Sequence, residues 1–118
     1  MPGNIKAQKA IIKEWAKANM VGNNYSSPVG LINITLAGIK EALNQPHRHP
    51  VEKLESNYRV ENLLAEAEFI KMSADKKDRP LNWYYLKIII AGSNSYIVIR
   101  EDTYLRTKIF YSIVDNIK

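Results

Sequence analysis

The sequence predicts an α+β domain in which helices pack on one face of a small antiparallel β-sheet. Apolar residues recur with helical spacing through much of residues 4–70. Near residue 80 the pattern changes to three runs rich in β-branched and aromatic residues, joined by short turns. A chain of 118 residues can bury a core as one domain without disulfides.

Residues 4–20 are predicted to form a basic amphipathic helix. Ile5, Ile12 and Trp15 supply an apolar face, and four lysines recur mostly at four-residue steps on the other. The next stretch, "VGNNYSSP" (Val21–Pro28), gathers turn-forming residues and predicts a flexible joint. We therefore expect residues 1–22 to be an arm or a preceding region, and residues 29–118 to be the domain.

The middle of the chain is predicted to alternate between a strand and helices. Thr35 is a suitable N-cap for the first of these helices. Pro46 and Pro50 end that helix and delimit a short loop. The expected elements are a strand over Val29–Thr35, helices over Gly38–Gln45 and Val51–Ile70, and a polar loop over Ser73–Pro80.

The last third of the chain is predicted to be a meander of three strands. Alternation places Arg100 on one face of the second strand and Ile97 and Ile99 on the other, which we expect to be the core. By the same rule Ser112 leaves the core and Tyr111 faces it. The expected strands are Asn82–Ala91, Asn94–Arg100 and Arg106–Val114, with Lys108 and Phe110 on the face of Ser112.

Composition excludes several classes of site. The chain has no cysteine, which removes disulfides, thiolate zinc sites and cysteine nucleophiles. It has no apolar run long enough to span a membrane, and its N-terminus lacks the pattern of a secretory signal. The net charge of +5 divides into +4 over residues 1–50 and +1 over residues 51–118. This asymmetry suggests an anionic partner, although a solvated helix face is the simpler interpretation.

Both histidines fall in "NQPHRHPVEKLE" (Asn44–Glu55), at His47 and His49. A metal pair is the weakest interpretation, because zinc needs a third or fourth ligand and the chain has no other histidine or cysteine. An acid/base pair is chemically suitable, because imidazole titrates near neutrality. A solvated loop between two helices is the interpretation that these residues, taken alone, favour.

Metal-independent RNA cleavage needs a base for the ribose 2′-OH, an acid for the departing oxygen and a cation for the phosphate. Two histidines flanking Arg48 offer these groups, but adjacent residues seldom act on one atom. Partners from the sheet are therefore expected. Arg100, at a strand end, suits either bidentate phosphate binding or a salt bridge to Glu101 or Glu52.

Two further groups are ambiguous. The loop Ser73–Pro80 brings lysines, arginine and aspartates together, and a mixed-sign surface loop is favoured over a phosphate-binding lip. The aromatic run Trp83–Tyr85 could stack bases, but aromatic residues at a strand start more often belong to a core.

Taken together, several motifs resemble nuclease domains associated with phage proteins and polymorphic toxins, in the barnase–EndoU–colicin–Rel-like (BECR) superfamily. The resemblance covers residues 29–118 in order and leaves the first helix outside. The motifs are "ITLAGIKEALNQPHRHPVEKLE", "VENLLAEAEFI", "ADKKDRP", "WYYLKIII" and "YIVIREDTYLRTKIFYSIVD".

The resemblance implies a curved antiparallel sheet whose concave face holds the site of a metal-independent, toxin-type ribonuclease without a cofactor. It implies RNA, with tRNA as one option, as substrate, and an acidic immunity or antitoxin protein as partner. The expected compartment is the cytoplasm of the producing or target bacterial cell, reached in the second case as part of a secreted toxin.

Carried onto matching positions, the resemblance indicates a catalytic set and a substrate-binding set. The alternative from a different class is a non-catalytic module of phage or mobile-element origin that binds nucleic acid or protein. The catalytic set is His47, His49, Arg100 of "IRE", and Tyr111 and Ser112 of "YSI"; the substrate-binding set is Lys40 of "GIKE", Arg48, Lys87 and Lys108.

Overall fold

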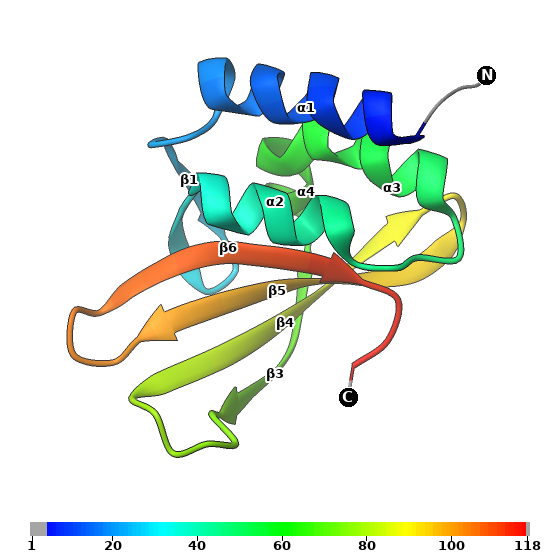
Figure 1. Cartoon of the computed structure of the whole chain (residues 1–118). Helices are drawn as coiled ribbons and strands as arrows, with labels where there is room; N and C mark the ends of the chain where they lie inside the picture. Colours follow the sequence, from blue (N-terminus) through cyan, green and yellow to red (C-terminus); the bar gives the residue numbers. More distant parts are fainter. Residues whose placement is uncertain (1–4, 118) are drawn as a thin grey trace.

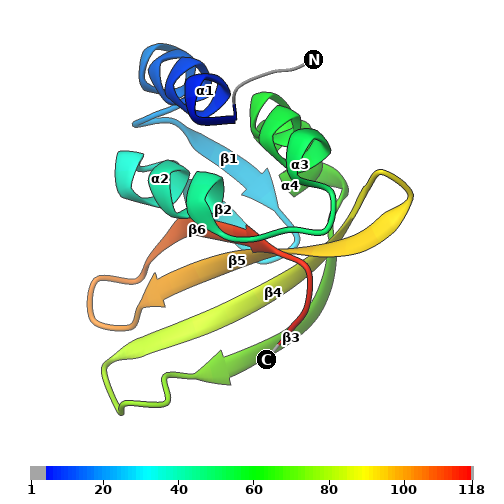
Figure 2. The same ribbon diagram turned by 45° about the vertical axis from the view of Figure 1, so that its right-hand side comes forward.

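The computed structural model describes residues 5–117 of the chain. Over this range, six strands form one mixed sheet in the order β1-β2-β6-β5-β4-β3. Figure 1 shows the helices gathered on one side of the curled sheet, and Figure 2 shows the same layering after a 45° turn. The helical elements are α1 (Ile5–Asn19), α2 (Leu36–Asn44), α3 (Pro50–Ser56), the 3₁₀ turn η1 (Asn57–Arg59) and α4 (Val60–Glu66). The strands are β1 (Asn24–Ser27), β2 (Gly30–Asn33), β3 (Glu68–Ala74), β4 (Leu81–Ile90), β5 (Ser93–Asp102) and β6 (Thr107–Val114).

The predicted fold class is confirmed: N-terminal helices pack on a curled sheet in an α+β domain (Figure 1). The predicted meander of β4, β5 and β6 is present, with antiparallel pairing throughout. One pairing is parallel, because β2 joins β6 at Asn33 and Ile109. The sheet is therefore mixed, and its strand order places the β1–β2 hairpin beside the last strand of the chain.

The stretch predicted as a flexible joint is a β-hairpin instead. β1 pairs with β2 along Asn24–Ser27, and Gly30 takes the positive φ of 112° that the turn requires. The Asn33 side-chain amide donates to the Asn24 side-chain oxygen at 3.2 Å, and the Ser27 hydroxyl donates to the Gly30 carbonyl at 2.8 Å. Hydrogen bonds from polar side chains can thus stabilise an edge hairpin whose sequence shows no alternation of apolar and polar residues.

Helix α1 belongs to the same core as the sheet, in contrast to the expected arm. Ile12, Ala16 and Met20 are at most 3% exposed and join the main apolar cluster. Trp15 packs edge-on against Tyr58 of η1, with ring centroids 4.9 Å apart. Residues 1–4, which the arm was also expected to include, and residue 118 lie outside the described range.

Helix α2 begins where its cap was predicted. The Thr35 hydroxyl accepts from the Gly38 backbone N–H at 3.0 Å. Gly38 also allows a close approach between layers, because a Cβ built there would lie 1.8 Å from the carbonyl oxygen of Phe110. A helix residue with any side chain cannot occupy this position unless α2 moves away from β6.

The predicted helix Val51–Ile70 ends earlier than expected. Its last residues form β3, so the "AEAEFI" motif crosses from α4 into a strand. Phe69 pairs with Leu86 of β4, and Ile70 is the extra residue of a bulge. The spacing of Leu64 and Ala67 is compatible with a continued helix. The backbone of the residues from Glu68 onward instead forms hydrogen bonds with β4 and so becomes a strand.

A second bulge changes which residues of β6 face the core. Val98 pairs with Ser112 and Ile99 pairs with Phe110, so Tyr111 is an extra residue between them. Strict alternation wrongly placed Phe110 with Ser112. Because of the bulge, Phe110 lies in the core, and Tyr111 and Ser112 both line the opposite face.

Candidate functional site

A cleft of about 560 Å³ lies on the sheet face opposite the helices, and we call it the sheet cleft. Its strand residues Trp83, Tyr85 and Val98 alternate with core residues of the same strands, so their side chains leave the core side. The cleft is lined by Gln45, Pro46, Ser73, Ala74, Asp75, Lys76, Lys77, Arg79, Trp83, Tyr85, Val98, Tyr111, Ser112, Val114, Asp115 and Asn116.

Of the residues predicted to be catalytic, Tyr111 and Ser112 line this cleft, and Arg100 lies beside it next to Tyr111. The Trp83 and Tyr111 rings pack edge-on, with centroids 5.0 Å apart. Arg100 pairs with Trp83 across the strands, and its guanidinium carbon lies 5.6 Å from the Tyr111 ring centroid. Ser112, 2% exposed, lines the same cleft. A guanidinium, a phenol and a hydroxyl are thereby gathered from β5 and β6.

Asp75, at the start of the loop before β4, organises one wall of the cleft. Its Oδ1 accepts from the Trp83 indole N–H at 2.9 Å and from Arg79 Nη2 at 3.0 Å. Its Oδ2 accepts from Arg79 Nε at 3.0 Å and from the backbone N–H groups of Lys77 and Arg79. These hydrogen bonds, from the Arg79 and Trp83 side chains first, hold the pKa of the Asp75 carboxyl well below its usual range.

His47 lies beside the cleft but does not line it. Its side chain is 0% exposed, and its Nδ1 accepts from the His49 backbone N–H at 2.8 Å. The ring proton therefore sits on Nε2, which lies 3.0 Å from Asp115 Oδ1 and 2.8 Å from Ser95 Oγ. Burial lowers the pKa of His47, and the Asp115 carboxylate opposes part of that shift. The geometry is that of a neutral imidazole that orients Asp115.

Arg48 and His49 complete this loop. Arg48 donates its backbone N–H to Asp115 Oδ2 at 2.9 Å and its Nε to Oδ1 at 3.3 Å. His49 Nε2 lies 3.3 Å from the Ser93 hydroxyl, and its ring centroid is 6.0 Å from that of His47. The loop after α2 is thereby held against β5 and the end of β6, where Asp115 enters the cleft lining.

The remaining cations expected to bind substrate lie elsewhere. Lys108 is on the helix-covered side, where its Nζ lies 3.3 Å from Glu101 Oε2. Lys87 Nζ lies 3.3 Å from Glu68 Oε1, and Lys40 is exposed on α2. The structure does not bring these three lysines into the cleft lining.

From the sequence, a phosphate-binding lip at the Asp75 loop and base stacking by Trp83 were both considered, but a surface loop and a core aromatic residue were favoured. One signal was available for each. Asp75 stands two residues before Lys77, the spacing at which an aspartate accepts from the backbone in a turn. Trp83 stands two residues before Tyr85 and so shares its face of β4.

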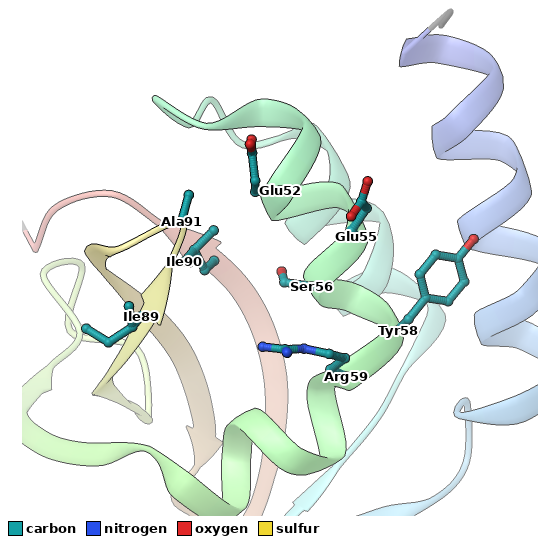
Figure 3. A pocket seen from close by; sticks show the side chains of 8 residues that line it. All are labelled: Glu52, Glu55, Ser56, Tyr58, Arg59, Ile89, Ile90 and Ala91. Carbon is teal, nitrogen blue, oxygen red and sulfur yellow. The ribbon is translucent and has the colours of Figure 1, made fainter. Parts of the chain in front are cut away.

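A second hollow of about 600 Å³ lies between α3, η1 and the end of β4, and Figure 3 shows the side chains that line it. Glu52, Glu55 and Arg59 line it together with Ile89 and Ile90. In this view Tyr58 points away from the strand residues, and Arg59 extends toward them. Two carboxylates disfavour a phosphate ligand here, so this hollow is not the better site for nucleic acid.

The described part of the chain contains neither a cluster of metal-ligating side chains nor a helix suited to span a membrane. Between residues 5 and 117, no group of three or more histidine, aspartate or glutamate side chains is placed to hold a metal ion. No helix in that range is both long and apolar enough to cross a membrane.

A family model for large polyvalent protein-associated domain 3 (LPD3) matches residues 3–111. The chain belongs to the LPD3 family. LPD3 is a phage-associated domain, so the expected phage association is confirmed. The match includes the first helix, in agreement with the packing of α1 in the core. No curated protein and no solved structure matches the chain.

Proposed function

We propose that this LPD3 domain is a metal-independent ribonuclease that acts at the sheet cleft. The observation that carries the proposal is the convergence of Arg100, Tyr111 and Ser112, which come from two strands and meet beside one cleft. The exposed side chains of Lys76 and Lys77 line the same cleft and supply positive charge for an RNA backbone.

The proposed reaction uses the RNA's own 2′-hydroxyl. Its oxygen attacks the adjacent phosphorus, the bond from phosphorus to the 5′-oxygen breaks, and a 2′,3′-cyclic phosphate remains. Arg100 offsets the charge that develops on the phosphate. The phenol of Tyr111 donates a proton to the departing oxygen, and the carboxylate of Asp115 accepts the proton of the 2′-hydroxyl. His47 and Arg48 position that carboxylate.

The test is digestion of total RNA and of a defined oligonucleotide, with and without EDTA. We expect cleavage that EDTA does not prevent and products that end in a 2′,3′-cyclic phosphate. Arg100→Ala is expected to lower the rate about 100-fold, on the scale of one electrostatic group in an active site. Lys6→Ala, an exposed cation of α1, is the matched control for net charge. Intact RNA, or cleavage that EDTA abolishes, would overturn the proposal.

A second candidate is a non-catalytic nucleic-acid-binding module that uses the same cleft. The burial of His47 favours it, because neither described histidine is among the cleft-lining residues. This candidate predicts salt-dependent binding with no turnover. Because His47 positions Asp115 in the proposed reaction, a folded His47→Ala, His49→Ala double variant should cleave more slowly, and full activity in that variant would exclude both histidines from catalysis.

A toxin-type ribonuclease that digests the RNA of a bacterial cytoplasm would harm the cell that makes it unless that cell inhibits it. We propose an acidic immunity protein that covers the sheet cleft, supported by the exposed Lys76, Lys77 and Arg79 at its rim. Expression of the domain alone should then arrest growth, and a co-expressed acidic neighbour should relieve the arrest. Relief that persists in a Lys76→Glu, Lys77→Glu variant would place the inhibitor on another surface.

A further inference from the structure

The ring of Trp83 is held by a hydrogen bond and by a neighbouring aromatic ring. Its indole N–H donates to Asp75 Oδ1 at 2.9 Å, and Tyr111 packs edge-on against the ring. Asp75 is itself 8% exposed and accepts from Arg79 through both oxygens. The ring of Trp83 is still partly exposed and lines the sheet cleft.

We propose that Trp83 is a base-stacking surface of the cleft and that Asp75 is the residue that positions it. The inference rests on the proposed function only in taking RNA as the ligand. An indole held in one orientation by a hydrogen bond loses little conformational entropy when a base stacks on it. The lysines that follow Asp75, at positions 76 and 77, then lie on the same loop as the group that orients the ring, and they can contact the adjoining phosphates.

A base can stack on a side chain only when it is not already stacked within a duplex. The cleft is therefore expected to select unpaired RNA. Stacking tolerates any base, because each has a π-face, so selection should depend on strandedness more than on sequence.

The two tryptophans of the chain provide a matched pair for the test. Trp15 lies on α1 against Tyr58, in the helical layer, whereas Trp83 lines the cleft. Trp15→Phe leaves only the emission of Trp83, and Trp83→Phe leaves only that of Trp15. The probe is a single-stranded 2′-O-methyl RNA of about 12 nucleotides, within the usual site sizes for single strands. It has no free 2′-hydroxyl and so cannot be cleaved by the proposed reaction.

We expect the single-stranded probe to quench at least half of the Trp83 emission and to leave the Trp15 emission unchanged. The same sequence as a duplex should not quench. Trp83→Ala should weaken binding of the single strand at least about fivefold, the lower end for loss of one stacked base. Trp83→Phe should retain part of that affinity. Unquenched Trp83 at saturating probe, or equal quenching by the duplex, would overturn the inference.

Asp75→Asn tests the positioning role. An amide has a single oxygen, which should turn toward the three donors that now bind Oδ2. Its NH2 group then faces the Trp83 indole N–H, so the ring should lose its fixed orientation. We expect weaker quenching and a Kd raised several-fold, with the circular dichroism of the fold retained. If this variant does not fold, Arg79→Ala removes the other partner while leaving the Asp75 bond to Trp83. Arg79→Ala should then retain the quenching, and loss of quenching in a folded Arg79→Ala protein would contradict the role of Asp75.

Failure of the two proposals can be told apart. Quenching by the probe without cleavage of ordinary RNA would overturn the ribonuclease proposal and support the stacking site. Cleavage of ordinary RNA with no change in Trp83 emission would support the ribonuclease proposal and overturn the stacking site.

Discussion

The two faces of the sheet differ in chemistry although the same strands build both. On the helix-covered face, Ile97, Ile99, Phe110 and Ile113 are fully buried. On the open face, aromatic and charged residues are only partly buried and form the sheet cleft. Substitutions on the covered face should therefore change the free energy of unfolding, whereas those on the open face should chiefly change binding and turnover.

The largest effect is expected from Gly38→Ala, on the covered side. The new methyl group would overlap the Phe110 carbonyl, so α2 must move away from β6. We expect the free energy of unfolding to fall by about 3 kcal/mol, measured by urea denaturation. Lys40→Ala, at an exposed position of the same helix, should change it by less than about 0.5 kcal/mol. A Gly38→Ala protein of unchanged stability would show that the two layers are not rigidly packed.

A smaller effect is expected from Lys53, a buried lysine of α3 whose ammonium donates to the Gln45 carbonyl. Burial, with repulsion from Lys9, lowers its pKa from 10.5 to about 8, against the attraction of Asp115 and Glu41. The unfolded chain therefore binds more protons between these values, so stability should rise from about pH 8 to 10.5. We expect a gain of about 2 kcal/mol over this window that Lys53→Met removes. Parallel pH–stability curves for the two proteins would contradict this.

On the open face, the contribution of Asp75 to stability should depend on pH in the acidic range instead of the basic range. Its folded pKa is depressed, so its stabilisation is present above the unfolded value near 3.9 and is lost as the pH falls toward the folded one. Asp75→Asn should therefore melt at a lower temperature than the wild type at pH 7. The difference should shrink progressively below about pH 4. A difference that stays constant down to pH 2 would assign the effect to packing instead.

The smallest effect is expected from His49→Ala. The hydrogen bond between its side chain and the Ser93 hydroxyl is long, at 3.3 Å. We expect a change in the free energy of unfolding within about 0.5 kcal/mol and no loss of RNA cleavage. His47→Ala should cost more stability, because it removes the group between Asp115 and Ser95. A catalytic defect in a stable His49→Ala protein would indicate that the active site lies at the loop of His47 and His49 and not at the sheet cleft.

Local signals predicted the parts of the fold that depend on neighbouring residues. The meander of β4 to β6 followed from alternation and short turns, and the Thr35 cap followed from side-chain chemistry. The edge strands β1 and β3 were missed. The residues of β1 are typical of a turn and those at the start of β3 continue a helical pattern, so only the pairing with a neighbouring strand makes them extended. For the site, the family resemblance indicated Tyr111, and a position at a strand end also indicated Arg100. Neither signal could show that the ring of His47 is buried against Asp115.

The bulge at Tyr111 gives the sheet cleft one more side chain than a regular strand would supply. The two halves of β6 are out of phase by one residue, so Phe110 and Ile113 both reach the core although an odd number of steps separates them. The two residues between them, Tyr111 and Ser112, both line the cleft. Deleting Tyr111 would restore simple alternation, which keeps Phe110 and Ile113 in the core and Ser112 in the cleft but removes the phenol and the local bend of the strand. A protein that lacks residue 111 should accordingly keep its core and lose only the function of the cleft.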